Sequence, residues 1–544
     1  MSSATPAATG SGSLRPEQPL VGAAPPLARV LVWAAAIGIG SSLLIMIVAS
    51  AARYSPAVPP MPWPPGLPPL EIAGHLPVTA TYAALWAAAA LGAGGVMAGL
   101  AAVARGARLP ARALIAAAFV AVAAFAVLPP AGSTDTLSYA TFGRMAVLGH
   151  DPYAMTPNQL DRAGDPIGRL APQIWRNHGS LYGPLATAEQ RAAAELGGGA
   201  AARIVFWLKL WNAIVFAGVV IGLDRMLRSD PARRARAHLL WSVNPLVLWA
   251  LAAGGHLEAF AAAASFFGLA LVRSRRDAGT ITGPEPLVAL AAGVLVGVAV
   301  NFMLAYLLLA LALAWALRRW PAALLAAAAG LCVTVVPPYL VAGSPLARAM
   351  LQRRGKVSAD NFYQLFSVAF RHHLPPGAEL VVAAAVVALA ALLLRRLPDA
   401  APGLRGVRLG LPAVRPALAI GIAWLFLWYY QLPWYDTMII ALLALYRASR
   451  LDYVVILQMT AGTLALLPGG SGGEPPLGWL RTFSHAIGFT WSPLLLLAAV
   501  VAVVALCVSG AWNIGPPPRN AEVTVGEAAA WPARGAAAGW PVRS

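Results

Sequence analysis

The chain has 544 residues, of which 59% are hydrophobic and 11% are charged, so its composition excludes an ordinary soluble domain, where about 25% of residues are charged. Apolar runs of about 20 residues recur along it, and this length crosses a hydrocarbon layer about 30 Å thick. The net charge of +18 comes mostly from Arg in short loops between these runs, which is typical of a multispanning membrane protein rather than of a nucleic-acid-binding protein.

The predicted elements in chain order form one transmembrane bundle between two tails. Residues 1–26 are rich in Ala, Ser, Gly and Pro and are expected to be disordered, as are residues 511–544. Residues 27–510 should form an all-α integral membrane domain, because the apolar runs are continuous and do not alternate as in a β-barrel. The fourteen predicted transmembrane segments cover residues 27–50, 78–103, 113–129, 204–223, 239–254, 258–272, 286–300, 303–317, 321–341, 379–394, 417–432, 436–446, 453–468 and 491–509.

Arginine-rich connections predict the topology. Cytoplasmic loops carry an excess of Lys and Arg, and fourteen crossings place all six such connections in the cytoplasm of a plasma-membrane protein, together with both termini. The extracytoplasmic side then receives a large loop after the third helix, 130–203, which we expect to contain short helices at the membrane surface, and a second loop, 342–378. The Arg-rich connections are residues 105–112, 225–238, 272–277, 317–320, 395–415 and 446–450.

The polar stretch GSTDTLSYATFGRMAVLGHDPY, residues 132–153, opens the first large loop. Asp135 follows a helix end, where a carboxylate can be partly desolvated and still reach a hydroxyl as a general base. Alternatively, Ser133, Thr134 or Asp135 caps a helix that begins at this point. The two roles do not exclude each other.

Further along this stretch, several side chains fit either a substrate site or ordinary structure. If residues 136–148 are helical, Tyr139 could stack on a sugar and Arg144 could receive a phosphate. The alternative is an interfacial amphipathic helix with a snorkelling Arg. Asp151, next to Pro152, is either a turn residue or a second acid near the site.

Cations in the second loop favour an anion site. Arg348, Arg353, Arg354 and Lys356 are expected on the outer side, against the usual bias, and could hold an anionic lipid headgroup or phosphate. The alternative is a solvated charged loop. Lys209 lies inside a predicted helix, where an ionisable group marks a site by default, and it could contact a lipid phosphate or pair with a carboxylate.

Two outer corners complete the candidate site. His256 and Glu258, in GGHLE, could hydrogen-bond sugar hydroxyls or form a structural pair. The stretch WLFLWYYQLPWYDTM, residues 424–438, could form sugar-stacking faces or only an aromatic interface belt. The chain has no Walker loop, GxGxxG, HExxH or D-x-D motif, so a nucleotide-sugar donor held by a metal is not indicated.

The order of these features resembles the GT-C glycosyltransferases, and within them the polyprenol-phosphomannose-dependent α-1,6-mannosyltransferases of bacterial cell envelopes. Where many relatives read closer to GHND, this chain has GGHLE, and where many carry a Lys near a broken helix, it has Asn301. Lys209 or the cations of 348–356 are therefore expected to take over the donor phosphate. The matching pieces are DTLSYATFGRMAVLGHDPY (135–153), SLYGPLAT (180–187), WSVNPLVLWALAAGGHLEA (241–259), KVSADNFYQLF (356–366) and QLPWYDT (431–437).

The resemblance implies transfer of a hexose, expected to be mannose, from a polyprenyl-phosphate donor to a glycan or glycolipid acceptor through an α-1,6 linkage. Asp135 would be the acceptor-activating base, with inversion in one displacement. No cofactor is certain, and a divalent cation stays open. The expected donor-phosphate ligands are Lys209, Arg348, Arg353, Arg354, Lys356 and Arg144. The expected sugar and acceptor ligands are Tyr139, Asp151, Tyr153, Tyr182, His256, Glu258, Trp434, Tyr435 and Asp436.

Two other classes of protein use similar residues. A transporter or flippase of a lipid-linked saccharide also needs aromatic and cationic side chains in a cavity, but it should show symmetrical halves and polar residues deep in many helices. A non-catalytic assembly protein gives no reason for an acid, cations and aromatics to collect on one side. The clustering of polar residues at the outer edge therefore favours the enzyme.

Overall fold

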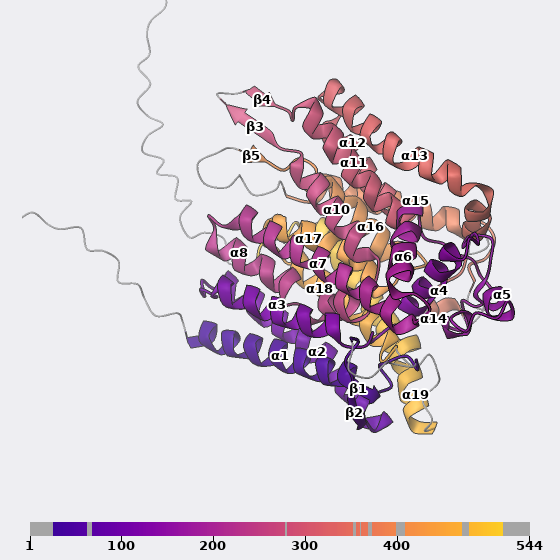
Figure 1. Ribbon diagram of the computed structural model, residues 1–544. Helices are drawn as coiled ribbons and strands as arrows, with labels where there is room; N and C mark the ends of the chain where they lie inside the picture. Colours follow the sequence, from indigo (N-terminus) through magenta and orange to yellow (C-terminus); the bar gives the residue numbers. More distant parts are fainter. Residues whose placement is uncertain are drawn as a thin grey trace, which may run out of the picture.

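The computed structural model describes residues 26–61, 68–277, 280–351, 355–358, 361–367, 373–398, 409–469 and 478–514. Both expected tails lie almost wholly outside these ranges, and so do Arg353 and Arg354 of the second loop. The described chain is mostly helical, as the composition predicted (Figure 1).

Within the described ranges, six helices are long and apolar enough to cross a bilayer. A seventh candidate is the pair Pro245–Ala253 and Glu258–Leu271, which is bent by 116° and is either a broken span or a re-entrant hairpin. The six are α1 (Pro26–Ala51), α2 (Val78–Ala104), α7 (Ala201–Leu227), α13 (Pro321–Leu351), α15 (Ala378–Arg396), and the run of α19 (Gly478–Ala486), η7 (Ile487–Trp491) and α20 (Ser492–Ser509).

Shorter apolar helices fill the bundle between the long ones. Each of the predicted apolar segments overlaps one helix or two or three consecutive helices, but many of these are too short to count as spans by length, so fourteen crossings stay a prediction. The shorter elements are α3 (Ala111–Val127), η2 (His238–Ser242), α9 (Pro245–Leu248), η3 (Trp249–Ala253), α10 (Glu258–Leu271), α11 (Pro286–Phe302), η4 (Leu304–Tyr306), α12 (Leu307–Leu317), α16 (Val414–Leu427), η6 (Pro433–Asp436), α17 (Thr437–Leu445) and α18 (Leu451–Leu466).

Small residues let the first two helices pack closely. A side chain at Gly38 of α1 would come within 2.9 Å of the Gly95 Cα on α2, so both positions need glycine for this approach. Close backbone contact through small residues is a common way for helices to associate in a membrane, where burial of apolar surface gives little driving force.

A set of non-spanning helices lies between α3 and α7, within the loop predicted at 130–203. Most side chains of the first of these helices are buried in the protein and its Arg144 is ion-paired with Asp165, unlike the alternative of an amphipathic interfacial helix with a snorkelling Arg. Its end is set by Leu148 and by Gly149, whose φ is +80°. The set consists of α4 (Asp135–Val147), α5 (Pro157–Arg162), η1 (Gly168–Leu170) and α6 (Pro184–Gly197).

Short strands, which the sequence did not predict, connect helices at the ends of the bundle. β1 (Ala52–Tyr54) pairs in parallel with β2 (Ile72–His75). In a second sheet, β3 (Ser274–Asp277) pairs antiparallel with both β4 (Thr280–Thr282) and β5 (Leu409–Gly410).

The two ends of the bundle differ in composition. Figure 1 shows α8 (Pro231–Ala237) and strands β3 to β5 at one end, and α4, α5 and α14 (Gln364–Ser367) at the other. At the α8 end, the Arg236 guanidinium binds the Asp452 carboxylate and the carbonyls of Leu443, Ala444 and Tyr446. The Arg-rich connections 225–238 and 446–450 therefore meet at the end away from α4.

Candidate active site

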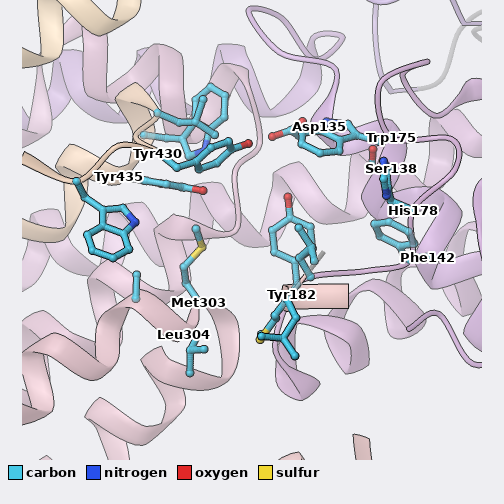
Figure 2. Close-up of a pocket in the computed structure, with 18 of the residues that line it drawn as sticks. Asp135, Ser138, Phe142, Trp175, His178, Tyr182, Met303, Leu304, Tyr430 and Tyr435 are labelled. Atoms are coloured by element: carbon cyan, nitrogen blue, oxygen red, sulfur yellow. The ribbon is translucent and has the colours of Figure 1, made fainter. Parts of the chain in front are cut away.

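A cavity of about 440 Å³ lies at the α4 end of the bundle (Figure 2). Its walls come from α4, the segment before α6, the break between α11 and α12, the end of α13, and the corner between α16 and α17. Aromatic side chains dominate the lining. The lining residues are Asp135, Ser138, Phe142, Trp175, His178, Gly179, Leu181, Tyr182, Met303, Leu304, Ala305, Met350, Leu351, Trp424, Trp428, Tyr429, Tyr430, Leu432, Trp434 and Tyr435.

One face of α4 brings the acid to this cavity. Asp135, Ser138 and Phe142 are spaced i, i+3 and i+7, which aligns them along one side of a helix. The Ser133 hydroxyl accepts the backbone N–H of Asp135 at 3.1 Å, and Thr134, at the N-cap position, makes no capping bond with its side chain. Ser133 thus supports the start of the helix, while the Asp135 carboxyl lines the cavity.

The turn before α4 is fixed by close packing. Gly132 has a φ of +79°, and a Cβ at this position would come within 2.3 Å of the Trp249 Nε1. The backbone N–H groups of Ala131 and Gly132 donate to the carbonyls of Ala253 and Ala57, at 3.1 and 2.9 Å. The backbone that leads into Asp135 is therefore held from two other segments of the chain.

The Asp135 carboxyl is perturbed by its surroundings. Its side chain is 15% exposed, and burial raises its pKa from 3.8 to about 6, while a hydrogen bond from the Trp175 indole acts in the opposite direction. A carboxyl with this pKa is mostly ionised at neutral pH and is a stronger base than an exposed Asp. Figure 2 shows the hydroxyl groups of Tyr182, Tyr430 and Tyr435 directed into the same open space as Asp135.

Behind Asp135, on the protein side, lies a second group of side chains. The His256 Nδ1 is 3.7 Å from the Asp135 Oδ2 and 3.4 Å from the Tyr139 hydroxyl. The His256 ring stacks on Trp434, with centroids 3.6 Å apart. Tyr139 in turn meets Tyr182 edge-on at 5.0 Å. Of these side chains, Trp434 and Tyr182 line the cavity, but His256 and Tyr139 do not.

Glu258 is also buried near the site. It is the first residue of α10, and its Oε2 atom has no hydrogen-bond partner. It lies within electrostatic range of Asp135 but does not line the cavity. The structure therefore groups His256 and Glu258 with the predicted base, without exposing either to a substrate in this cavity.

The second loop borders the same cavity as Asp135. Met350 and Leu351, next to the exposed Arg348, line its wall, and the Lys356 Nζ lies 5.2 Å from the centre of the Trp175 ring. Trp175 is also the residue that hydrogen-bonds Asp135, so it lies between the acid and a cation.

Backbone hydrogen bonds attach this loop to the aromatic corner. The Ser358 N–H donates to the Tyr429 carbonyl at 3.1 Å, and the Ser358 hydroxyl accepts the N–H of Gln431 at 2.9 Å. The Asn361 amide donates to the Trp428 carbonyl at 2.7 Å. The segment that carries Lys356 is therefore fixed beside the wall formed by residues 428–431.

Two predicted phosphate ligands lie elsewhere. Lys209 is fully buried, and its Nζ donates to the carbonyls of Leu128 and Pro129, at 2.6 and 3.0 Å, just after α3 ends. Arg144 is ion-paired with Asp165 at 2.7 Å. Neither lines the cavity, so the structure gives them structural partners where the sequence suggested a phosphate.

Three predicted sugar ligands are also engaged away from the cavity lining. Asp151 accepts the Tyr153 N–H at 2.9 Å, which is the turn role that its place beside Pro152 left open. The Tyr153 hydroxyl bonds the Thr187 hydroxyl at 2.8 Å. Asp436 is buried at the start of α17.

Other lining residues were not predicted. Trp175 and His178 lie in WRNHGSLYGP, a segment without helical or strand periodicity, and nothing local indicates that it turns toward Asp135. Tyr430 belongs to the aromatic corner that the sequence analysis had noted, but only as a group. Over the described part of the chain, no group of three or more His, Cys, Asp or Glu side chains could hold a metal ion.

Comparison with known proteins gives a consistent family. The model of the family described as "Alpha-(1->6)-mannopyranosyltransferase, N-terminal domain" matches residues 35–319. A probable alpha-(1->6)-mannopyranosyltransferase of Mycolicibacterium smegmatis is 29% identical over 161 residues, which is 30% of this chain and 29% of that protein. An alpha-(1->6)-mannopyranosyltransferase of Mycobacterium tuberculosis is 26% identical over 160 residues, 29% of this chain and 27% of that protein.

These matches differ in how much of the chain they cover. The chain aligns with less than a third of the length of either curated relative, and no solved structure matches it. The family model, in contrast, covers more than half of the chain, and its range includes α4 with Asp135. The chain is therefore a membrane protein that belongs to the alpha-(1->6)-mannopyranosyltransferase family.

Proposed function

We propose that the protein transfers mannose from a polyprenyl-phosphate donor to a glycan or glycolipid acceptor, with inversion and formation of an α-1,6 linkage. The observation that carries this proposal is that Trp175, which lines the same aromatic cavity as Asp135, hydrogen-bonds that acid and has the Lys356 amine 5.2 Å from its ring centre. An acid alone or a cation alone would fit a transporter equally well. An acid and a cation on either side of one cavity-lining Trp175 fit a reaction that releases a proton at one point and an anionic leaving group at another.

In the proposed reaction, Asp135 is the general base. The acceptor hydroxyl oxygen attacks the anomeric carbon, and its proton passes to the Asp135 carboxylate. The bond between the anomeric carbon and the phosphate oxygen breaks, and the polyprenyl phosphate leaves with the bonding electrons as an anion. One base and one cationic region are sufficient for this single displacement, whereas retention would require a second, nucleophilic group at the sugar.

The walls of the cavity fit the two parts of such a donor. The tyrosine hydroxyls of Tyr182, Tyr430 and Tyr435 face the sugar region, and Trp434 offers a stacking surface. Met303, Leu304 and Leu351 form an apolar region suited to the first units of the lipid carrier. Lys356 is the described cation assigned to the leaving phosphate, with Arg348 at the rim.

The proposed orientation places this cavity on the extracytoplasmic side. The Arg-rich connections at the α8 end would face the cytoplasm under the positive-inside rule. The α4 end, with the cavity, would then face outward, where a lipid carrier delivers a sugar without a nucleotide. Labelling of cysteines introduced at each end in intact cells tests this orientation, and labelling of an α4-end cysteine only after permeabilisation would reverse it.

The reaction itself is tested with purified protein, polyprenyl-phosphate-mannose and short mannan acceptors, followed by linkage analysis of the product. Asp135→Asn should abolish transfer, and Asp161→Asn, which changes an exposed carboxyl on α5, is the matched control that should not. Lys356→Ala should raise the donor KM, and Lys356→Arg should restore most of the affinity. Full activity of Asp135→Asn would remove this residue from the mechanism.

A further inference from the structure

His256 lies where it cannot reach a sugar in the Asp135 cavity. It occupies the break between η3 and α10, is 1% exposed and does not line that cavity. The hollow that it does line, beside Gly132 and Trp249, has a volume of about 10 Å³. This is room for one water molecule at most. The structure therefore leaves no room for a sugar ring against His256 in either of these two cavities.

The imidazole is instead oriented against the acid. The ring is almost parallel to Trp434, at 17° and 3.6 Å between centroids, so its plane is fixed by a side chain that itself lines the cavity. The Nδ1 atom is hydrogen-bonded to the Tyr139 hydroxyl at 3.4 Å and lies 3.7 Å from the Asp135 Oδ2, slightly beyond hydrogen-bond distance. The same ring nitrogen is therefore close to two side chains of α4.

Asp135 needs such support because few groups hold it. The Trp175 indole hydrogen-bonds the carboxyl, and the Ser133 hydroxyl holds only its backbone N–H. A catalytic group gains most of its effect when neighbouring side chains fix it within a fraction of an ångström, and a misplacement of about 1 Å can cost about 100-fold in rate.

We propose that His256 is a positioning residue, whose Nδ1–H faces the Asp135 carboxyl from the protein side and limits its movement, while Trp434 fixes the imidazole plane. The proposal rests on the proposed function, in which Asp135 is the base. It replaces the sugar-binding role that the sequence suggested for His256. In this proposal, Trp434 contacts a sugar in the cavity on one side and the His256 ring on the other, so it connects sugar binding to the position of Asp135.

Two substitutions separate the two contacts of the ring. His256→Phe keeps a flat ring against Trp434 and loses the nitrogen, whereas His256→Asn keeps an N–H near the Nδ1 position and loses the ring. We expect His256→Phe to lower kcat about 10- to 100-fold, with the donor and acceptor KM within about threefold of the wild type. His256→Asn should keep more of kcat than His256→Phe. A larger loss in His256→Asn, or a rise in KM with kcat unchanged, would overturn the proposal.

A pH profile gives a readout that a purely structural role would not change. An N–H that holds the ionised carboxyl lowers its pKa, so without it the acid limb of kcat/KM should move to higher pH in His256→Phe. An unchanged limb would contradict the proposed contact. Among the described residues, the other titratable or charged groups around this pair are Tyr139 on α4, His178 and Tyr182 before α6, Glu258 on α10, Tyr430 and Tyr435 at the aromatic corner and, beyond Trp175, Lys356.

A structure of His256→Phe tests the proposal without relying on transfer of mannose. The Asp135 carboxyl should rotate away from its position in the wild type, while Trp434 and α4 stay in place. An unmoved carboxyl would overturn the positioning role even if mannose transfer is confirmed. Conversely, absence of transfer by the wild-type protein would overturn the proposed function, and the position of Asp135 in the variant would still decide the role of His256.

Discussion

Replacement of Asp135 by Asn should make the protein more stable while it removes activity. The pKa of Asp135 is raised from 3.8 to about 6, mainly by burial, so the folded state holds the ionised carboxyl less favourably than the unfolded chain does. Because one pKa unit corresponds to about 1.4 kcal/mol, ionisation of this carboxyl costs the folded state about 3 kcal/mol at neutral pH. An uncharged Asn has almost the same shape and can still accept the Trp175 hydrogen bond.

The size of the stability gain depends on pH. A group whose pKa is raised on folding contributes its stability below its unfolded pKa and loses it as the pH rises through the folded value. The advantage of Asp135→Asn should therefore be full above about pH 7, shrink near pH 6 and vanish toward pH 4. In melting experiments in detergent at these pH values, we expect a rise of a few degrees at pH 8.

The control for this experiment is Asp161→Asn, which should leave the melting temperature unchanged at every pH. A melting temperature of Asp135→Asn equal to or below that of the wild type at pH 8 would refute the reasoning, and so would a gain that does not change with pH. Gain of stability together with loss of transfer would show that the position is kept acidic at a cost to the fold, as expected of a catalytic group.

Three further predictions concern neighbouring side chains. Trp175→Phe should shift the acid limb of the pH profile upward by about one to two pH units, because a hydrogen bond to a charged group is worth about 1.5–3 kcal/mol; a downward shift or none would contradict this. Lys209→Met should lower stability by about 2–4 kcal/mol by leaving two buried carbonyls without donors, and should not change the donor KM; a raised KM at unchanged melting temperature would restore Lys209 as a phosphate ligand. Arg236→Met should cost about 3–5 kcal/mol by leaving the Asp452 carboxylate buried and unpaired, and a second change, Asp452→Leu, should recover much of this loss; equal melting temperatures of the single and double variants would argue against the pair.

The positions of the helices could be predicted because the signals for them are local. The sequence suggested a helix over residues 136–148, from a polar start to a following glycine, and the structure has α4 at Asp135–Val147, one residue earlier at each end. The corner at residues 428–436 was likewise marked by Pro433 between two apolar runs. Apolar length and turn residues are sufficient for this level of description.

The roles of single polar side chains could not be predicted, because they depend on partners far away in the chain. Lys209 looked like a phosphate ligand, but its amine reaches carbonyls about 80 positions earlier in the sequence. His256 looked like a sugar ligand, but its Nδ1 atom lies close to Asp135 and Tyr139, and Trp434 stacks on its ring. The residue types indicated which interactions each side chain could make, but only the packing of the helices determines which side chains are in contact.

The cavity is lined by segments that lie far apart in the sequence and are therefore synthesised at different times. Asp135 and the Trp175 segment lie within residues 35–319, the range that the family model matches, whereas 350–351 and 424–435 lie beyond it. Most of the chain must therefore be synthesised and inserted into the membrane before the cavity around Asp135 is complete. Until then the nascent polypeptide carries the proposed base without an enclosed cavity. A product truncated after residue 319 should therefore lack activity even if it inserts into the membrane, and co-expression of the missing part as a separate chain should restore the cavity.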